Sequence, residues 1–312
     1  LPGWNSQFPL RPEQNRSLSW MVKQETSGHY FEEEEVSEKL FPLLNIRAEG
    51  RACRKRLVRG GIVADQVGFG KTAIAVAVIS ALQGVPTSTS DCTVCTKATL
   101  ILVPSQLMKQ WPNEIEKFCP SLEKVVIKTM ADLNALTVEQ VKRSDVVLVN
   151  TSIFRSAAYF SRLAQLAGVP ELPQDSSRQF TAAYDEAVEK LQERMPRIRA
   201  GDLSAEPRES TKCVTVVSNR IKGAKLIKTT IAAGGEGMNF VETLDAEKVP
   251  DKKPPFVFFK EGSEVLDKMC SPLFEMFHWK RVIVDEFTYL QDFDRRVATA
   301  MVADAKWCLS GT

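Results

Sequence analysis

A short apolar run that passes directly into a glycine-containing turn, and then into an apolar helix, constrains the fold of this chain most. Residues 61–64 read Gly-Ile-Val-Ala, the turn spans residues 65–70, and a helical pattern follows from Lys71 to Leu82. Because the run is apolar throughout rather than alternating, it predicts a strand buried on both faces, as in a parallel sheet. The two glycines of the turn, Gly68 and Gly70, allow backbone conformations that other residues rarely adopt.

Four further runs of the same kind recur along the chain. They are Thr99–Val103, Asp145–Val149, Arg281–Val284 and Lys306–Leu309. A helical pattern at Ser105–Phe118 follows the first of them, with an apolar stripe at Leu107, Trp111, Ile115 and Phe118. Alternating strands and helices predict an α/β fold with a doubly wound parallel sheet.

Residues 64–72 carry the strongest chemical signal, Ala-Asp-Gln-Val-Gly-Phe-Gly-Lys-Thr. A strand before the turn and a helix after it are the context of a phosphate-binding loop, since a helix N-terminus presents free N–H groups to an anion. In that interpretation Lys71 faces the β- and γ-phosphates and the Thr72 hydroxyl ligates magnesium. Asp65 stands where the strict pattern has glycine, and Gly-Lys-Thr alone is a common tripeptide.

A second signal, a pair of acidic residues after a strand, strengthens this interpretation. Residues 282–284 are Val-Ile-Val, and Asp285 and Glu286 follow them directly. Asp285 is placed to hold magnesium through water, and Glu286 to orient or deprotonate an attacking water. Two exposed acids at the end of one strand are common, but they become a specific signal when a phosphate loop precedes them in the same chain.

Composition limits the remaining possibilities. The formal net charge of the 312 residues is +2, so contacts to nucleic acid would have to come from local patches. Seven cysteines without a framework spacing favour a reducing compartment, and we interpret the Cys92 and Cys95 pair as ordinary thiols rather than a zinc site. No apolar run is long enough to cross a bilayer, and the ends of the chain indicate a piece of a longer protein.

Several other features have plain interpretations. The acidic run Glu32–Glu35 is interpreted as a solvated helix start. The basic run from Arg51 to Arg59 is equally compatible with a charged helix face and with a phosphate contact or import signal. The glycines of residues 234–237 are interpreted as a mobile connection, because no Lys-Ser/Thr follows them. Between Phe154 and Phe277 the pattern loosens, and residues 155–273 are expected to form an insertion with small elements such as a helix at Tyr184–Met195.

Three segments carry a resemblance to a known family, the Swi/Snf-type ATPases of helicase superfamily two. Residues 10–14, Leu-Arg-Pro-Glu-Gln, with Trp20, resemble the adenine-reading motif, in which Gln14 pairs with the base edge. Residues 101–105, with Gln110 and Trp111, are similar to a motif that touches the DNA backbone. Residues 307–312, Trp-Cys-Leu-Ser-Gly-Thr, resemble the motif that couples hydrolysis to lobe movement. Residues 145–152 are a weaker match to a DNA-contact motif.

The resemblance implies a complete first RecA-like lobe. The implied ATP site comprises Gln14, Gly68, Gly70, Lys71 and Thr72, with Asp285 and Glu286, and it holds ATP and Mg²⁺. The implied DNA contacts are Pro104, Ser105, Gln110 and Thr151, and the coupling residues are Ser310, Gly311 and Thr312. The expected organisation is an N-terminal segment at 1–58, lobe sequence at 59–154, the insertion at 155–273 and the rest of the lobe at 274–312. Two departures are Gln66, where the family has glutamate, and Thr288, where it has histidine.

The implied function is an ATPase that moves along duplex DNA or chromatin in the nucleus. Such engines bind ATP between two lobes, and the second lobe supplies arginine fingers, worth roughly 10³–10⁵ in rate. This stretch alone is therefore expected to be nearly inactive. Two alternatives stay open: a degenerate nucleotide- or DNA-binding module, and a phosphate-loop enzyme without a DNA role. Within the family, the ring-finger-bearing branch and the ATPase arm of eukaryotic maintenance DNA methyltransferases are the most similar in pattern.

Overall fold

The computed structural model describes residues 1–27, 30–84, 92–173, 178–200, 216–219, 227–230 and 266–311. The chain divides into two compact units, residues 1–203 with 256–312, and residues 204–255. The α-helices are α1 (Pro12–Thr26), α2 (Lys71–Ala81), α3 (Gln110–Phe118), α4 (Met130–Ala135), α5 (Val138–Arg143), α6 (Ala157–Ala167), α7 (Arg178–Arg199) and α8 (Asp292–Ala300). The strands are β1 (Tyr30–Phe41), β2 (Ile46–Leu57), β3 (Gly60–Val63), β4 (Val94–Cys95), β5 (Thr99–Val103), β6 (Lys124–Ile127), β7 (Val146–Asn150), β8 (Val216–Asn219), β9 (Ile227–Thr230), β10 (Phe277–Val284) and β11 (Val302–Leu309). Short 3₁₀ turns are η1 (Pro42–Leu44), η2 (Ser105–Leu107), η3 (Thr151–Arg155), η4 (Phe274–Met276) and η5 (Phe287–Tyr289).

In the described part of the first unit, seven strands form one parallel sheet. Six of them lie in the order β3-β11-β10-β5-β7-β6, and β4 also pairs with β10. Every pairing in this sheet is parallel. The five apolar runs predicted as strands form β3, β5, β7, β10 and β11, which confirms the α/β class and the parallel sheet.

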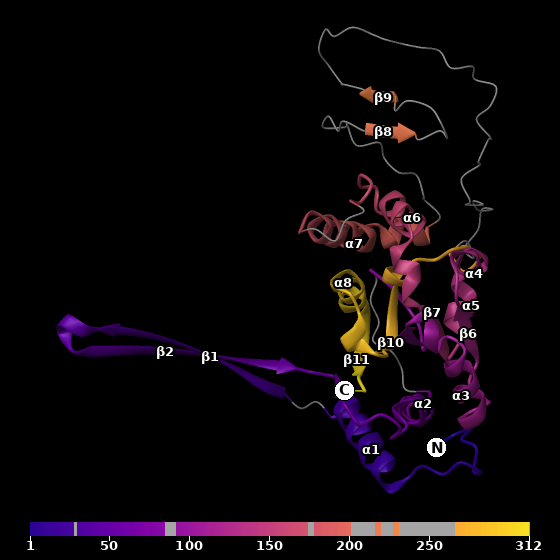
Figure 1. Ribbon diagram of the computed structural model, residues 1–312, viewed down its shortest axis with the longest axis horizontal. Helices are drawn as coiled ribbons and strands as arrows, with labels where there is room; N and C mark the ends of the chain where they lie inside the picture. Colours follow the sequence, from indigo (N-terminus) through magenta and orange to yellow (C-terminus); the bar gives the residue numbers. More distant parts are fainter. Residues whose placement is uncertain are drawn as a thin grey trace. The chain divides into compact units, whose positions relative to one another are not determined.

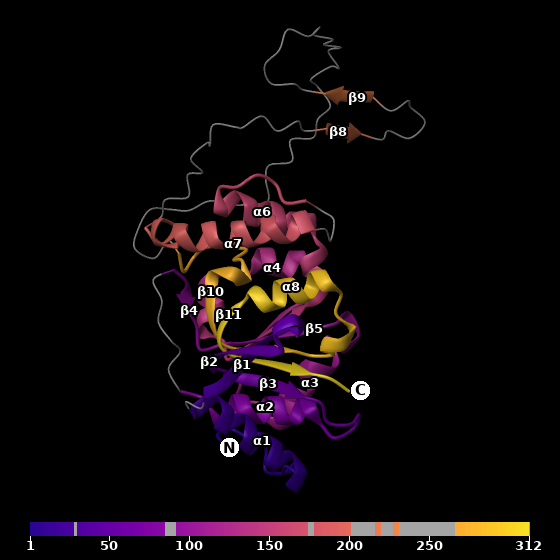
Figure 2. The same ribbon diagram turned by 90° about the vertical axis from the view of Figure 1, so that its left-hand side faces the viewer.

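Helices cover both faces of this sheet (Figures 1 and 2). Side chains of β5 alternate between the two faces: Ile101 and Val103 join the core cluster beneath α1, α2 and α3, whereas Leu100 and Leu102 join the cluster beneath α4 to α8. Because both faces are covered, a run such as Thr99–Val103 is buried at every position. The predicted stripe on α3 is confirmed at Trp111 and Ile115, which are buried in the first of these clusters.

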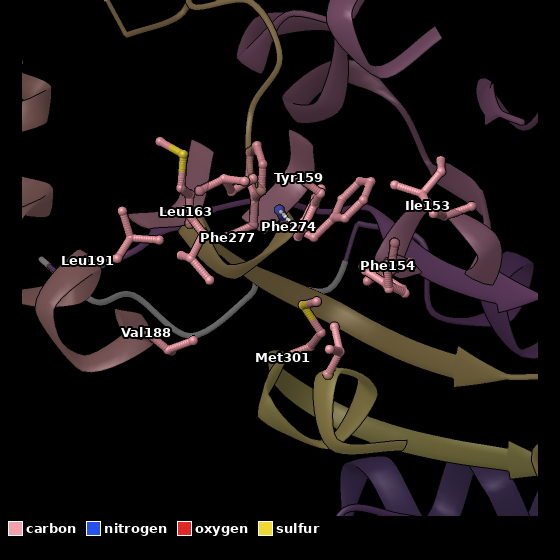
Figure 3. Close-up of a cluster of buried hydrophobic side chains, with 14 of the residues drawn as sticks. Ile153, Phe154, Tyr159, Leu163, Val188, Leu191, Phe274, Phe277 and Met301 are labelled. Atoms are coloured by element: carbon pink, nitrogen blue, oxygen red, sulfur yellow. Dashed lines mark hydrogen bonds between the residues drawn. The ribbon is translucent and has the colours of Figure 1, made fainter. Parts of the chain in front are cut away.

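Helices α6 and α7, which lie within residues 155–273, pack into the core of the first unit. Figure 3 shows Leu163 of α6 and Leu191 of α7 near Phe277 of β10, and all three belong to one core cluster. The helix predicted at Tyr184–Met195 is confirmed as part of α7. In the second unit, β8 and β9 pair antiparallel. The glycines of 234–237, interpreted as a mobile connection, lie outside the described residues.

The acidic and basic runs before the phosphate loop form a hairpin, so the helical interpretations of both were wrong. Glu32–Glu35 lie in β1, and β2 holds the basic residues from Arg51 to Arg56, whereas Arg59 lies in the loop that follows. The strands pair antiparallel, and Arg56 bonds Glu33 across them at 2.9 Å. Opposite charges on facing strands stabilise this pairing, and Asn45 adopts the left-handed conformation at the turn. Among the described residues, no helix combines the length and apolar content needed to cross a membrane.

Candidate functional site

The register of the sheet brings the expected site residues to one edge. Val284 of β10 lies opposite Leu102 of β5 and Cys308 of β11, and Leu309 lies opposite Val63 of β3. The segments that follow these strands therefore leave the sheet side by side. Backbone hydrogen bonds continue the alignment, since Asp285 N donates to Leu102 O at 2.9 Å and Ser310 N to Val63 O at 3.1 Å. Ligands of open α/β sheets bind at this carboxyl edge.

The turn between β3 and α2 has the geometry of an anion cradle. Gly68 and Gly70 have φ values of 88° and 80°, in the left-handed region that favours glycine. A Cβ on Gly70 would lie 2.5 Å from Gln14 Nε2, so a larger residue would displace the Gln14 amide as well as strain the backbone. The ammonium of Lys71 donates to Asp65 O at 2.7 Å, across the mouth of the loop. Thr72 is the second residue of α2, where N–H groups lack helical partners.

Asp285 and Glu286 stand at the end of β10. The carboxylate of Asp285 is nearly buried and accepts hydrogen bonds on both oxygens, from Trp111 Nε1 at 2.8 Å and from Glu286 N at 3.0 Å. Burial raises the pKa of Asp285 above its ordinary value of 3.8, and the hydrogen bond from Trp111 opposes that rise. Glu286 has a φ of 51°. Such strain in a residue other than glycine is typical of functional sites.

The segment after β11 closes the site from a third side. A Cβ on Gly311 would lie 3.6 Å from Lys71 Nζ and 3.6 Å from Glu286 Oε1, so the phosphate loop, the acid pair and this segment meet. The hydroxyls of Ser310 and Thr288 are 3.4 Å apart. Thr288, which departs from the family pattern, therefore still contacts the expected coupling segment. Thr312 lies outside the described residues.

The donors at this edge fit magnesium. The hydroxyl of Thr72 and the carboxylate of Asp285 are hard oxygen ligands, and magnesium commonly takes one or two protein ligands together with phosphates and water. The parts of the chain that the structure describes contain no group of three or more His, Cys, Asp or Glu placed to hold a metal. A magnesium ion completed by the nucleotide phosphates does not require such a group.

Gln14 lies against the phosphate loop, 55 residues away in sequence. Its Oε1 accepts from Arg11 N at 2.9 Å, which caps α1, and its Nε2 donates to Phe69 O at 2.9 Å. Gln14 is 7% exposed, although it belongs to the first turn of a surface helix. The structure thus brings the expected adenine-reading residue beside the expected phosphate site.

Three of the four residues expected to contact DNA line a cavity of about 450 Å³ that adjoins this edge. Pro104, Ser105 and Thr151 line it, together with Glu286. Gln110 is exposed at the start of α3 and does not line it. Ser152, the last residue of the weaker motif match, also lines it, whereas sequence reasoning missed Arg155, Tyr289 and Asp294. Asp294 is buried and accepts from Arg155 Nη2 at 2.8 Å, a pair 139 residues apart that no local pattern predicts.

Comparison with known proteins identifies the family. The profile of the SNF2-related domain matches residues 13–168, half of the chain, and the match includes Gln14, Lys71 and Pro104. This chain belongs to the SNF2-related domain family. It is therefore a helicase-like domain of an ATPase family, as the motif resemblance predicted, and the parallel sheet with helices on both faces agrees with that assignment.

Two curated proteins and one solved structure are similar to this chain. The DNA (cytosine-5-)-methyltransferase DMT5 of Cryptococcus neoformans is 34% identical over 98% of the chain, and that of Verticillium dahliae is 29% identical over 100%. The chain spans 15% of the length of each of these relatives. A solved Sulfolobus solfataricus SWI2/SNF2 ATPase core in complex with dsDNA covers 100% of the chain at 13% identity, with a TM-score of 0.41, and the chain covers 34% of it. The expected similarity to the ATPase arm of DNA methyltransferases agrees with the first two.

Proposed function

We propose that this chain is the ATP-binding first lobe of a DNA-dependent ATPase that moves along duplex DNA. The observation that carries the proposal is the shared sheet edge, where the phosphate loop, the acid pair and the Gly311 segment converge within contact distance. A generic phosphate-loop enzyme needs the first two segments but not the DNA-contact residues beside them. Here Glu286 belongs to both the nucleotide edge and the wall of the adjoining cavity.

Each residue at the carboxyl edge of the sheet, where the nucleotide is proposed to bind, has one proposed task. The loop glycines let backbone N–H groups approach the phosphates, and Lys71 leaves its contact with Asp65 O to neutralise the β- and γ-phosphates. Thr72 and Asp285 would hold Mg²⁺, which would neutralise charge on the phosphates. Glu286 orients and deprotonates the attacking water. Gln14 reads the adenine base, and the contact between Thr288 and Ser310 links the acid pair to the coupling segment.

Duplex DNA is the proposed ligand of the cavity lined by Pro104, Ser105 and Thr151. The exposed hydroxyls of Ser105 and Ser152 and the half-exposed guanidinium of Arg155 are suited to backbone phosphates. Gln110 lies at the start of the next helix. The relatives that are similar over most of the chain are DNA methyltransferases, which supports a DNA substrate, chromatin included, and a nuclear location. A second RecA-like lobe elsewhere in the full-length protein completes the ATP site with arginines, without which turnover is slow.

Two substitutions of opposite charge at Ser152 test whether the cavity binds DNA. Ser152 is exposed on the cavity wall, so substitution there changes charge with little effect on stability. In the full-length protein, Ser152→Glu should weaken duplex DNA binding and Ser152→Lys should strengthen it. Each substitution should change the slope of the logarithm of the DNA-binding constant against the logarithm of salt concentration by about one. The matched control is Ser37→Glu in the hairpin, which should leave both quantities unchanged. Equal DNA affinity in both Ser152 variants would contradict DNA binding in this cavity.

A further inference from the structure

Trp111 connects two segments to which the proposed function gives separate tasks. It is the second residue of α3, its side chain is buried in the core beneath α1 to α3, and it is 1% exposed. Its ring Nε1–H donates to Asp285 Oδ2 at 2.8 Å, across 174 residues of sequence. The indole therefore spans from the start of a helix to the carboxylate at the end of β10.

This hydrogen bond fixes the orientation of the carboxylate. The other oxygen of Asp285 accepts from Glu286 N, which belongs to the same strand end and moves with it. Trp111 is the partner that comes from another element, so the position of α3 determines how the carboxylate faces. Partners of this kind, which hold a metal ligand without touching the metal, commonly set metal affinity.

The same helix is joined to the cavity by a short segment. Residues 104–107, which include η2, line the cavity, and only three residues separate Leu107 from Trp111. A ligand that displaces this segment therefore also displaces the indole that holds Asp285. Glu286, one residue further, already lies on the cavity wall.

We propose that Trp111 is a positioning residue that orients Asp285 for magnesium and transmits occupation of the cavity to it. The inference rests on the proposed function, because it requires a magnesium-nucleotide at the sheet edge and DNA in the cavity. To the proposed function it adds a physical connection between the magnesium-nucleotide site and the cavity, through the indole of Trp111. A purely structural role would require only that the buried N–H find any acceptor.

Trp279 provides a matched control for that structural role. Its side chain is fully buried, and its Nε1–H donates to Phe274 O at 3.1 Å, a backbone carbonyl beneath the other face of the sheet. Replacement of either indole by phenylalanine removes one buried hydrogen bond and a similar volume. Only the replacement at Trp111 removes a partner of the acid pair.

The test measures magnesium without relying on turnover. In the full-length protein, a fluorescent ADP analogue is titrated at increasing Mg²⁺, and the Mg²⁺ concentration for half-maximal binding is determined. Trp111→Phe should raise that midpoint by roughly 10- to 100-fold, and Trp279→Phe should leave it near wild type. Trp111→β-(3-benzothienyl)alanine keeps the ring size and removes the N–H donor, so it should raise the midpoint as well even if the phenylalanine variant folds poorly.

A second part of the experiment tests whether Trp111 transmits occupation of the cavity to Asp285. Duplex DNA should lower the Mg²⁺ midpoint in the wild type, because linkage between two binding sites is reciprocal. In the folded Trp111 variants, which still bind DNA, duplex DNA should leave the midpoint unchanged. A wild-type midpoint in a folded variant that lacks the N–H would overturn the positioning role. Retention of the DNA effect in that variant would overturn transmission through Trp111. If the wild type itself bound nucleotide without regard to Mg²⁺, the proposed function would fail and this inference with it.

Discussion

The amide of Gln14 keeps half of its hydrogen-bonding capacity. Its contacts with Arg11 N and Phe69 O use one lone pair and one N–H, which leaves one acceptor and one donor. That pair matches the N6 donor and N7 acceptor of adenine, whereas guanine offers acceptors at both positions. We therefore expect ATP to be preferred over GTP by roughly 10- to 100-fold, since an unpaired buried group costs about 1–3 kcal/mol.

Gln14→Ala should largely erase this preference. Competition binding of ATP and GTP to the full-length protein measures it. Gln24→Ala is the matched control, because Gln24 lies on the same helix and donates to Val58 O at 2.8 Å, away from the phosphate loop. Unchanged discrimination in the Gln14 variant would mean that the base is read elsewhere.

Glu286 is expected to handle the attacking water rather than the nucleotide. Its Oε1 would lie 3.6 Å from a Cβ on Gly311, as would Lys71 Nζ, whereas the buried Asp285 is the proposed magnesium ligand. Glu286→Gln keeps the shape and loses the basicity, so ATP should still bind while turnover stops. A binding titration beside a turnover assay tests this, with Glu139→Gln, at a surface ion pair, as control. Loss of binding together with turnover would assign Glu286 another role.

At the scale of elements, a buried acid joins α6, α7 and η4. Glu275 accepts hydrogen bonds from the hydroxyls of Tyr159 and Tyr184 at 2.5 and 2.7 Å, and all three side chains are buried. Burial raises the pKa of Glu275 above its ordinary value of 4.5, and the tyrosine hydrogen bonds oppose the rise. The folded state therefore binds this proton more tightly than the unfolded state does.

The consequence is a pH dependence of stability with a definite sign. The stabilisation from protonated Glu275 is fully present below the unfolded pKa, near 4.5, and is lost as pH rises through the raised folded pKa. Glu275→Gln should remove this contribution, so its free energy of unfolding should fall less than that of the wild type between those two values. Urea unfolding at several pH values, with Glu171→Gln as an exposed control, measures it. Parallel profiles for the Glu275 variant and the wild type would contradict the expectation.

The strands could be predicted from the sequence because burial on both faces leaves a continuous apolar run. Thr99–Val103 illustrates this, since every residue is buried. The β1–β2 hairpin could not be predicted, because glutamate is a good helix former and all positions of both strands are exposed. Its structure depends on a partner strand, and the pairing of Glu33 with Arg56 leaves no periodic pattern. Secondary-structure propensity and the spacing of apolar residues therefore both fail to predict such an element.

The site was predictable where function requires a local spacing. Lys71 and Thr72 follow the loop glycines directly, and Asp285 and Glu286 follow their strand. The contacts that arrange these groups were not predictable, since Trp111 reaches Asp285 across 174 residues and Gln14 reaches Phe69 across 55. Trp111 was visible as a member of an apolar stripe and of the motif that resembles a DNA contact, and only its polar N–H indicated that it needs a buried acceptor.

At the scale of the whole molecule, Glu286 belongs both to the proposed ATP site and to the cavity proposed for DNA, so hydrolysis and DNA binding are expected to be coupled. The expected coupling is to be measured in the full-length protein, where the proposed second lobe would complete the ATP site. Three outcomes are distinguishable there: turnover raised by DNA, turnover indifferent to DNA, and nucleotide binding without turnover. They correspond to the proposed engine, a phosphate-loop enzyme without a DNA role, and a degenerate binding module.

The most direct measurement is steady-state ATP turnover by the full-length protein with and without duplex DNA, alongside Lys71→Ala. Lys71 stands beside the expected phosphates, and its ammonium donates to the loop carbonyls of Asp65 and Gln66. The account predicts that DNA raises turnover severalfold in the wild type. It also predicts that Lys71→Ala reduces turnover to background under both conditions, with a wild-type melting temperature. DNA-independent turnover, or near-normal turnover in the folded Lys71 variant, would contradict the account.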